Sequence, residues 1–90
     1  PEMAKVRPAV VVSGEVHNTA LETIVVVPLS SLAPEIRPLR VSLGTIAGKE
    51  SFAIVPGIRQ VSKRRLRGLI GAADPNRLSS LDACLRTYLG

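Results

Sequence analysis

Short apolar runs, separated by proline, glycine and serine, constrain the fold of this chain more than any other feature. Residues 8–13, 22–29, 39–43, 51–55 and 58–61 are rich in Val, Leu and Ile, and turn-forming residues bound them. The first two runs lack polar alternation, which predicts strands buried on both faces. In the third, Arg40 and Ser42 alternate with apolar residues, which predicts a half-exposed strand.

The connecting segments and the end of the chain are different. Residues 14–20 predict a polar loop, 44–50 a turn, and 62–65 a single helical turn before an extended segment over 66–71. From Asp74 and Pro75 onward, leucines recur at spacings of three and four, which predicts an amphipathic helix. The expected fold is mainly β with a C-terminal helix that covers the open side of a small, curled antiparallel sheet.

The length of the chain limits the size of its core. Ninety residues predict a single domain over 1–90, with an aliphatic core in which only Phe52 and Tyr88 are aromatic. A core this small predicts pairing with a second copy. The one cysteine, Cys84, is expected to pack as a small hydrophobe in a reducing cytosol. No apolar run reaches the roughly 20 residues needed to span a bilayer, so the expected location is cytoplasmic, with no membrane partner.

Positive charge is concentrated in one short stretch. The net charge is +5, and Arg59, Lys63, Arg64, Arg65 and Arg67 lie within nine residues without an acid. A folded basic surface favours nucleic acid over a merely solvated face, and an acidic protein segment would fit the same surface. One histidine, one cysteine and scattered carboxylates give no metal-ligand spacing, and no Gly-rich phosphate loop is present, so no cofactor is expected.

Four pieces of the sequence together resemble the PemK and MazF toxins of bacterial type II toxin-antitoxin systems. They are RPAVVVS at 7–13, Asn18, TIVVVPLSS at 23–31 and IRQVSKRRL at 58–66. The resemblance covers nearly the whole chain and implies an SH3-like, partly open antiparallel barrel of the CcdB/PemK type, assembled as a homodimer. The opening PEMAKVRP is similar to a loop that follows the first strand in one branch of the family, which implies that this strand is missing here.

The resemblance also implies an activity and a partner. Members of the family are mRNA interferases that inhibit translation. They cut single-stranded mRNA without a metal through attack by the 2'-hydroxyl, and a cognate antitoxin with an acidic disordered tail restrains them. Arg7 matches the catalytic arginine before proline, and Ser30 matches a catalytic threonine. The implied RNA-binding residues are Lys5, His17, Asn18, Ser31, Arg59, Lys63, Arg64 and Arg65.

Other interpretations of these residues stay open. Arg7 could cap a strand end, Ser30 could simply end a strand, and Asn18 could either fix its loop or read a base edge. The family usually has an acid and a glutamine where this chain has Pro56 and Gly57. This difference leaves the general base unassigned, with Glu15, His17 and Glu22 as candidates. The alternative function is a non-catalytic nucleic-acid-binding relative, or a toxin with a protein target such as gyrase.

Overall fold

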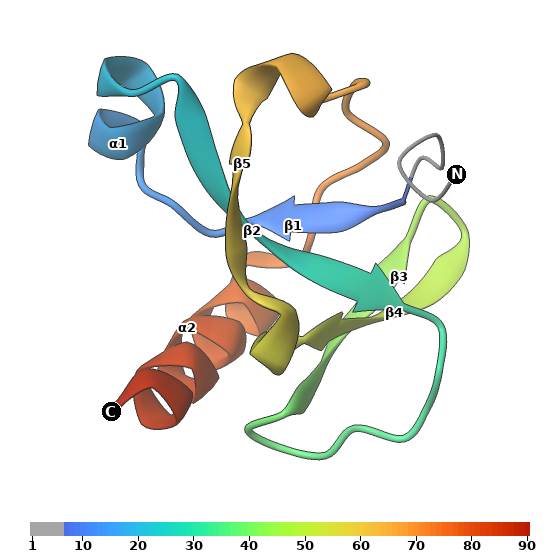
Figure 1. The fold of residues 1–90 in the computed structure, drawn as a ribbon. Coiled ribbons are helices and arrows are strands. Elements are labelled where there is room, and N and C mark those ends of the chain that lie inside the picture. The colour runs from blue at the N-terminus through green and yellow to red at the C-terminus, as the bar shows by residue number, and fades with distance from the viewer. Residues whose placement is uncertain (1–6) are drawn as a thin grey trace.

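The computed structural model describes residues 7–90, so the candidate Lys5 lies outside the described part. Figure 1 shows a curled antiparallel sheet with one long helix packed beside it. Along the chain the elements are β1 (Ala9–Val11), α1 (Glu15–Ala20), β2 (Thr23–Ser30), β3 (Arg40–Ile46), β4 (Lys49–Ile54), the 3-10 turn η2 (Val55–Gly57), β5 (Arg59–Ser62), the 3-10 turn η3 (Lys63–Arg65) and α2 (Pro75–Leu89).

Strand β2 organises the sheet because it pairs with three other strands. Its first part pairs with β5 on one side, its middle with β1 on the other, and its last two residues with β4, which in turn pairs with β3. Every pairing is antiparallel. A strand that changes partners along its length bends the sheet around itself, and the result is the partly open barrel that was predicted.

The core lies between one face of this sheet and α2. Leu81, Cys84 and Leu85 of the helix join a cluster of buried residues that includes Val27, Val41, Leu43, Ala53 and Val55. The C-terminal helix is confirmed as predicted: the Asp74 side chain accepts a hydrogen bond from the Asn76 N–H at 2.9 Å, and Pro75 occupies the first turn. Cys84 packs in this core, as expected.

The prediction that the first two strands are buried on both faces was wrong. β1 has a partner on one side only and is largely exposed, with Val11 at 45% of its full accessibility. β2 also alternates in burial along its first half, with Ile24 and Val26 more buried than Thr23 and Val25. Both strands belong to an antiparallel sheet whose two faces are covered to different extents, and a run of valines carries no polar residue to mark the less covered face.

Local structure also differs from the prediction in two connections. Residues 15–20 form the short helix α1 rather than a loop, and the Leu21 N–H donates to the His17 carbonyl to close it. The turn predicted over 44–50 is only the pair Ala47 and Gly48, with φ of 51° and 80°. A two-residue turn with positive φ matches strand twist, so β3 and β4 extend almost to the tip of the hairpin.

The end of the chain before α2 is irregular. Residues 66–71, predicted to be extended, belong to no strand and leave Leu69 at 91% accessibility. The single helical turn predicted over 62–65 is present as η3, with Ser62 as its N-cap. Across residues 7–90, no helix is both long and apolar enough to cross a bilayer.

Candidate functional site

The register between β1 and β2 brings the two predicted catalytic residues together. Ala9 pairs with Pro28 and Val10 with Val27, and the Leu29 N–H donates to the Pro8 carbonyl at 3.1 Å. When this register continues by one more pair, Arg7 lies opposite Ser30. Residues directly opposite in an antiparallel pair share one face of the sheet, so the two side chains leave the backbone on the same face.

The chemistry of both side chains suits an anion. Arg7 is exposed, and the ring of Pro8 restricts the backbone that follows it. The Ser30 hydroxyl accepts a hydrogen bond from the Leu32 N–H at 3.0 Å, which closes a tight turn at the end of β2. A hydroxyl that accepts this bond still has its own proton to donate, and a guanidinium offers a planar pair of donors. The pair can therefore hold two oxygens of one phosphate.

Arg59 lies on the same face, closer to the other end of the sheet. It pairs with Val26 of β2, and Val26 pairs on its other side with Val11 of β1. Val11 is four residues after Arg7 in the alternating strand pattern, so Arg59, Val11 and Arg7 share a face. Arg59 is exposed. A polyanion lying along this face could contact both guanidinium groups.

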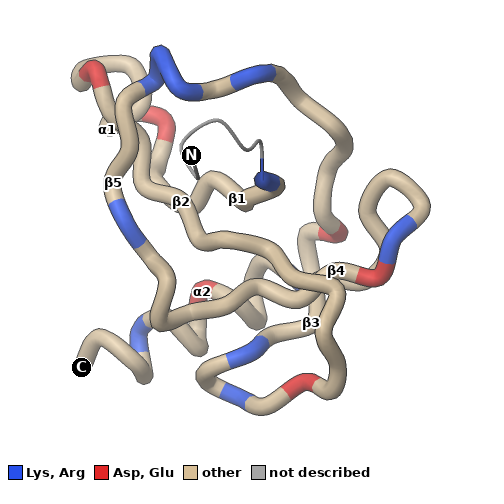
Figure 2. Tube along the Cα trace, turned by 45° about the vertical axis from the view of Figure 1, so that its right-hand side comes forward, with Lys and Arg blue, Asp and Glu red and all other residues tan. Residues whose placement is uncertain are grey.

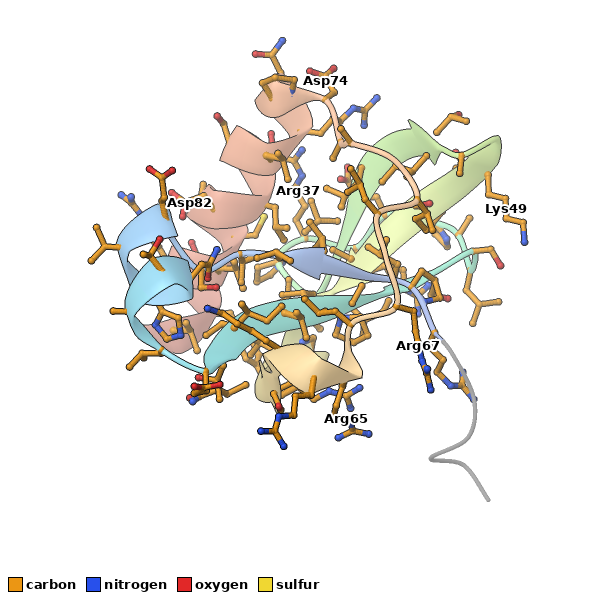
Figure 3. The ribbon with its side chains drawn as sticks, turned by 90° about the horizontal axis from the view of Figure 1, so that it is seen from above. Arg37, Lys49, Arg65, Arg67, Asp74 and Asp82 are labelled. Carbon is orange, nitrogen blue, oxygen red and sulfur yellow. The ribbon has the colours of Figure 1, made fainter. Side chains whose placement is uncertain are left out.

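The cations that follow β5 extend this basic surface. Figure 2 shows basic positions recurring along β5, η3 and the segment that follows η3. Arg64 and Arg65 are exposed, and the Arg64 N–H donates to the Ser62 hydroxyl at 3.2 Å. Figure 3 shows the Arg67 side chain at the side of the molecule where β1 begins. Arg67 was part of the basic run but was not singled out as a site residue, because nothing in its local sequence shows that the chain turns back toward β1.

Lys63 has a different environment from its neighbours. Its Nζ donates to the carbonyl of Asn18, and its backbone N–H donates to the carbonyl of Glu22 at 2.9 Å. The side chain therefore joins η3 to the end of α1, and its ammonium group is less available to a phosphate than the guanidinium groups of Arg64 and Arg65.

Asn18 and Ser13 form a closed set of hydrogen bonds at the start of α1. The Ser13 hydroxyl donates to the Asn18 Oδ1 and accepts from the Val25 N–H at 3.0 Å, while the Asn18 Nδ2 donates to the Ser13 carbonyl at 3.2 Å. Of the two interpretations of Asn18, this arrangement favours the one in which it fixes its loop.

Within one protomer, the three candidate general bases lie far in space from Arg7 and Ser30. Glu15 and His17 are on α1, and Glu22 precedes β2, at the opposite end of the sheet from the start of β1 (Figure 1). Glu22 is eight residues before Ser30. At roughly 3.3 Å per residue of strand, the strand between them spans at most about 26 Å. None of the three can reach a phosphate held by Arg7 and Ser30 of the same chain.

His17 instead faces a separate groove. Its Nε2 is buried and has no hydrogen-bond partner within the described residues. The groove has a volume of about 570 Å³ and is lined mainly by residues around α1 and the last turns of α2, among them Asp82, Leu85 and Arg86. His17 is thus directed toward the C-terminal helix and away from the Arg7 and Ser30 face.

Pro56 and Gly57 stand where the family usually has an acid and a glutamine. They form η2, where a Cβ added to Gly57 would lie 2.5 Å from the Pro28 Cγ. The backbone of η2 therefore packs directly on β2. Glycine is required here by the close approach of Pro28, and no carboxylate is available at this place for proton transfer.

One carboxylate in the loop between β2 and β3 is tied to the backbone. Glu35 Oε2 accepts from the Ser42 N–H at 2.9 Å and lies 3.3 Å from the Arg37 Nε. The backbone hydrogen bond, and to a lesser extent Arg37, lower the pKa of Glu35, although partial desolvation acts in the opposite direction. Ser31, in the same loop, is exposed.

Within residues 7–90 no three His, Cys, Asp or Glu side chains group closely enough to hold a metal.

The curled antiparallel sheet, the C-terminal helix and the run of cations along β5 and η3 define a class of small β proteins with one basic face. Residues 1–89 match the family described as PemK-like, MazF-like toxins of type II toxin-antitoxin systems, and the chain belongs to that family.

Solved structures share this fold. A mycobacterial endoribonuclease superposes with a TM-score of 0.82 at 24% identity, covering 93% of this chain and 80% of the other. A mycobacterial endoribonuclease in complex with its cognate antitoxin gives a TM-score of 0.84 at 23% identity, covering 97% and 84%. A MazE-MazF complex from Deinococcus radiodurans gives 0.79 at 25% identity, covering 93% and 81%.

Proposed function

We propose that this protein is a toxin that cuts single-stranded mRNA without a metal ion and thereby inhibits translation and growth. The observation that carries the proposal is the β1 and β2 register, whose continuation beyond Ala9 and Pro28 puts Arg7 opposite Ser30, in a chain of the PemK and MazF family. Related folds that are described as endoribonucleases are consistent with it.

In this proposal the RNA supplies its own nucleophile. The 2'-hydroxyl attacks the adjacent phosphorus, the bond to the 5'-oxygen breaks, and the products are a 2',3'-cyclic phosphate and a free 5'-hydroxyl. Negative charge increases on the non-bridging oxygens in the transition state. Arg7 and Ser30 would stabilise that charge by donating hydrogen bonds to those oxygens.

We also propose two partners. A second copy would cover part of the exposed apolar surface, since residues such as Leu69 and Val16 are exposed in the single chain. A cognate antitoxin with an acidic tail would lie over the basic surface, as the antitoxin complexes of similar folds suggest. Its affinity should fall when Arg64 and Arg65 are replaced, and an unchanged affinity would argue against that surface.

The test incubates the complete protein, which circular dichroism has shown to be folded, with a long single-stranded RNA in excess EDTA. The Arg7→Ala variant is treated in the same way. Discrete cuts with cyclic phosphate ends that disappear in the variant would support the proposal. Loss of a charged hydrogen bond made in the transition state should slow cleavage by roughly 10² to 10³-fold while RNA binding largely persists. Intact RNA with folded wild-type protein would contradict it and favour a non-catalytic binder or a toxin with a protein target.

A further inference from the structure

We infer that Glu50 is the general base that works with Arg7 and Ser30, an inference that rests on the proposed RNA cleavage. The pairing of β2 with β4 supplies the first step. Ser30 pairs directly with Phe52, and Glu50 is two residues before Phe52 in the same strand. Residues two apart in a strand share a face, so Glu50, Phe52, Ser30 and Arg7 all leave the sheet on one face.

The distance between Glu50 and Ser30 suits a carboxylate that reaches a substrate bound at Ser30. Glu50 is a diagonal neighbour of Ser30 across the strand pair, and such neighbours have Cα atoms about 7–8 Å apart. Arg7 lies on the other side of Ser30. Figure 1 shows the three segments, the start of β1, the end of β2 and the β3–β4 hairpin, gathered at one side of the molecule. A nucleotide between Arg7 and Glu50 would have its phosphate and its 2'-hydroxyl within reach of both.

The other described carboxylates have different positions or different partners. Glu15 and Glu22 lie at the far end of the sheet, and Glu35 is bound to the Ser42 N–H and to Arg37. Asp74 caps α2, and Asp82 pairs with Arg86 at 3.0 Å on the helix. Glu50 is exposed, close to the tip of the hairpin, where an RNA strand can approach it.

The Glu50 carboxylate takes the proton of the 2'-hydroxyl as the 2'-oxygen forms its bond to phosphorus. As the bond from phosphorus to the 5'-oxygen breaks, that oxygen takes a proton from water, and the Glu50 carboxyl returns its proton to solvent. Glu50 therefore fills the role that Pro56 and Gly57 leave vacant, from the neighbouring strand rather than from η2.

The experiment measures single-turnover cleavage of a short RNA that carries a site cut by the wild-type protein. Glu50→Gln keeps the shape of the side chain but cannot accept the proton, so cleavage should slow by roughly 10² to 10⁴-fold. RNA affinity should not weaken. Glu50→Asp should recover part of the rate, and Glu22→Gln, the matched control, should cleave normally.

The outcomes separate the two proposals. Wild-type cleavage with an equally active Glu50→Gln variant would overturn the role of Glu50 and leave the proposed nuclease intact. Absence of cleavage by folded wild-type protein would overturn both. Circular dichroism of each variant shows whether a slow rate reflects lost structure, and a folded Glu50→Asp variant with no activity above Glu50→Gln would also count against the inference.

Discussion

The contact between Gly57 and Pro28 shows how a single residue can define the shape of this site. Gly57 has no side chain, and the space that its Cβ would occupy is filled by the Pro28 ring. The contact holds η2 against β2, and β5 with Arg59 begins two residues later. The position of Arg59 on the sheet therefore depends on a residue that makes no contact with RNA in the proposed mechanism.

Gly57→Ala should destabilise the protein because the added methyl group would overlap Pro28. Overpacking of this kind typically costs about 1–3 kcal/mol, which urea unfolding would measure as a lower midpoint. Gly14→Ala is the control, since no atom lies within 4 Å of its added Cβ, and it should change stability by less than about 0.5 kcal/mol. The double variant Gly57→Ala with Pro28→Ala should lose less free energy of unfolding than the two single variants lose together. A Gly57→Ala protein as stable as wild type would contradict this account.

At the scale of elements, the carboxylate of Glu35 ties the loop between β2 and β3 to strand β3. Glu35 reaches the backbone of Ser42 in β3, seven residues later, while Arg40 Nη1 donates to the Pro34 carbonyl at 3.4 Å. These bonds hold the loop close to the edge strand β3. The loop begins directly after Ser30, so its order also affects the turn that orients the Ser30 hydroxyl.

Removal of this carboxylate should change how stability depends on pH. The pKa of Glu35 is lower in the folded protein, mainly because of the Ser42 N–H, so the ionised group adds stability above its unfolded pKa of about 4.3. That contribution is lost as the pH falls through the lower, folded pKa. Glu35→Gln should therefore reduce the urea midpoint at pH 7, and its difference from wild type should shrink below about pH 4.

The control for Glu35 is Glu22→Gln, which removes an exposed carboxylate for which no hydrogen bond is found within residues 7–90. Its midpoint at pH 7 should stay close to that of wild type. If Glu35→Gln and Glu22→Gln behaved alike at both pH values, the bond to Ser42 would contribute little to stability.

At the scale of the whole molecule, the net charge of +5 is unevenly distributed. The basic residues of β5, η3 and the segment after η3 form one basic surface beside the sheet. Helix α2 carries both acidic and basic side chains, and its Asp82 pairs with Arg86. A polyanion should therefore bind on one side, and its affinity should depend on salt through the cations of that side.

Salt dependence can locate this surface. In an Arg7→Ala background that slows cleavage, replacing Arg64 and Arg65 with Gln should lower the slope of log affinity against log salt by about 1.4, because each contact with a single-stranded phosphate contributes about 0.7. The matched control replaces Arg77 and Arg86, two cations of α2, and changes the net charge equally. An equal loss in both variants would show that total charge, rather than the surface after β5, determines RNA affinity.

Local signals in the sequence determined several features of this protein. Asp74, Pro75 and the leucine spacing predicted α2, because capping and helical periodicity act between residues close in the chain. The apolar runs predicted where strands form, and Ser62 with the following cations predicted a helical turn. The resemblance selected Arg7 and Ser30, and the basic run was visible without any structure.

Tertiary structure decided what these residues do together. Only pairing between distant strands gives the register that, continued by one pair, puts Arg7 opposite Ser30, and that makes Glu50 diagonal to Ser30. The same fold sets His17 and Glu22 at the other end of the sheet. The half-exposed β1 could not be predicted either, since a run of valines fits one-sided and two-sided burial equally well. Register depends on contacts between residues far apart in the chain, and a shift by one residue would turn every side chain of a strand to the opposite face.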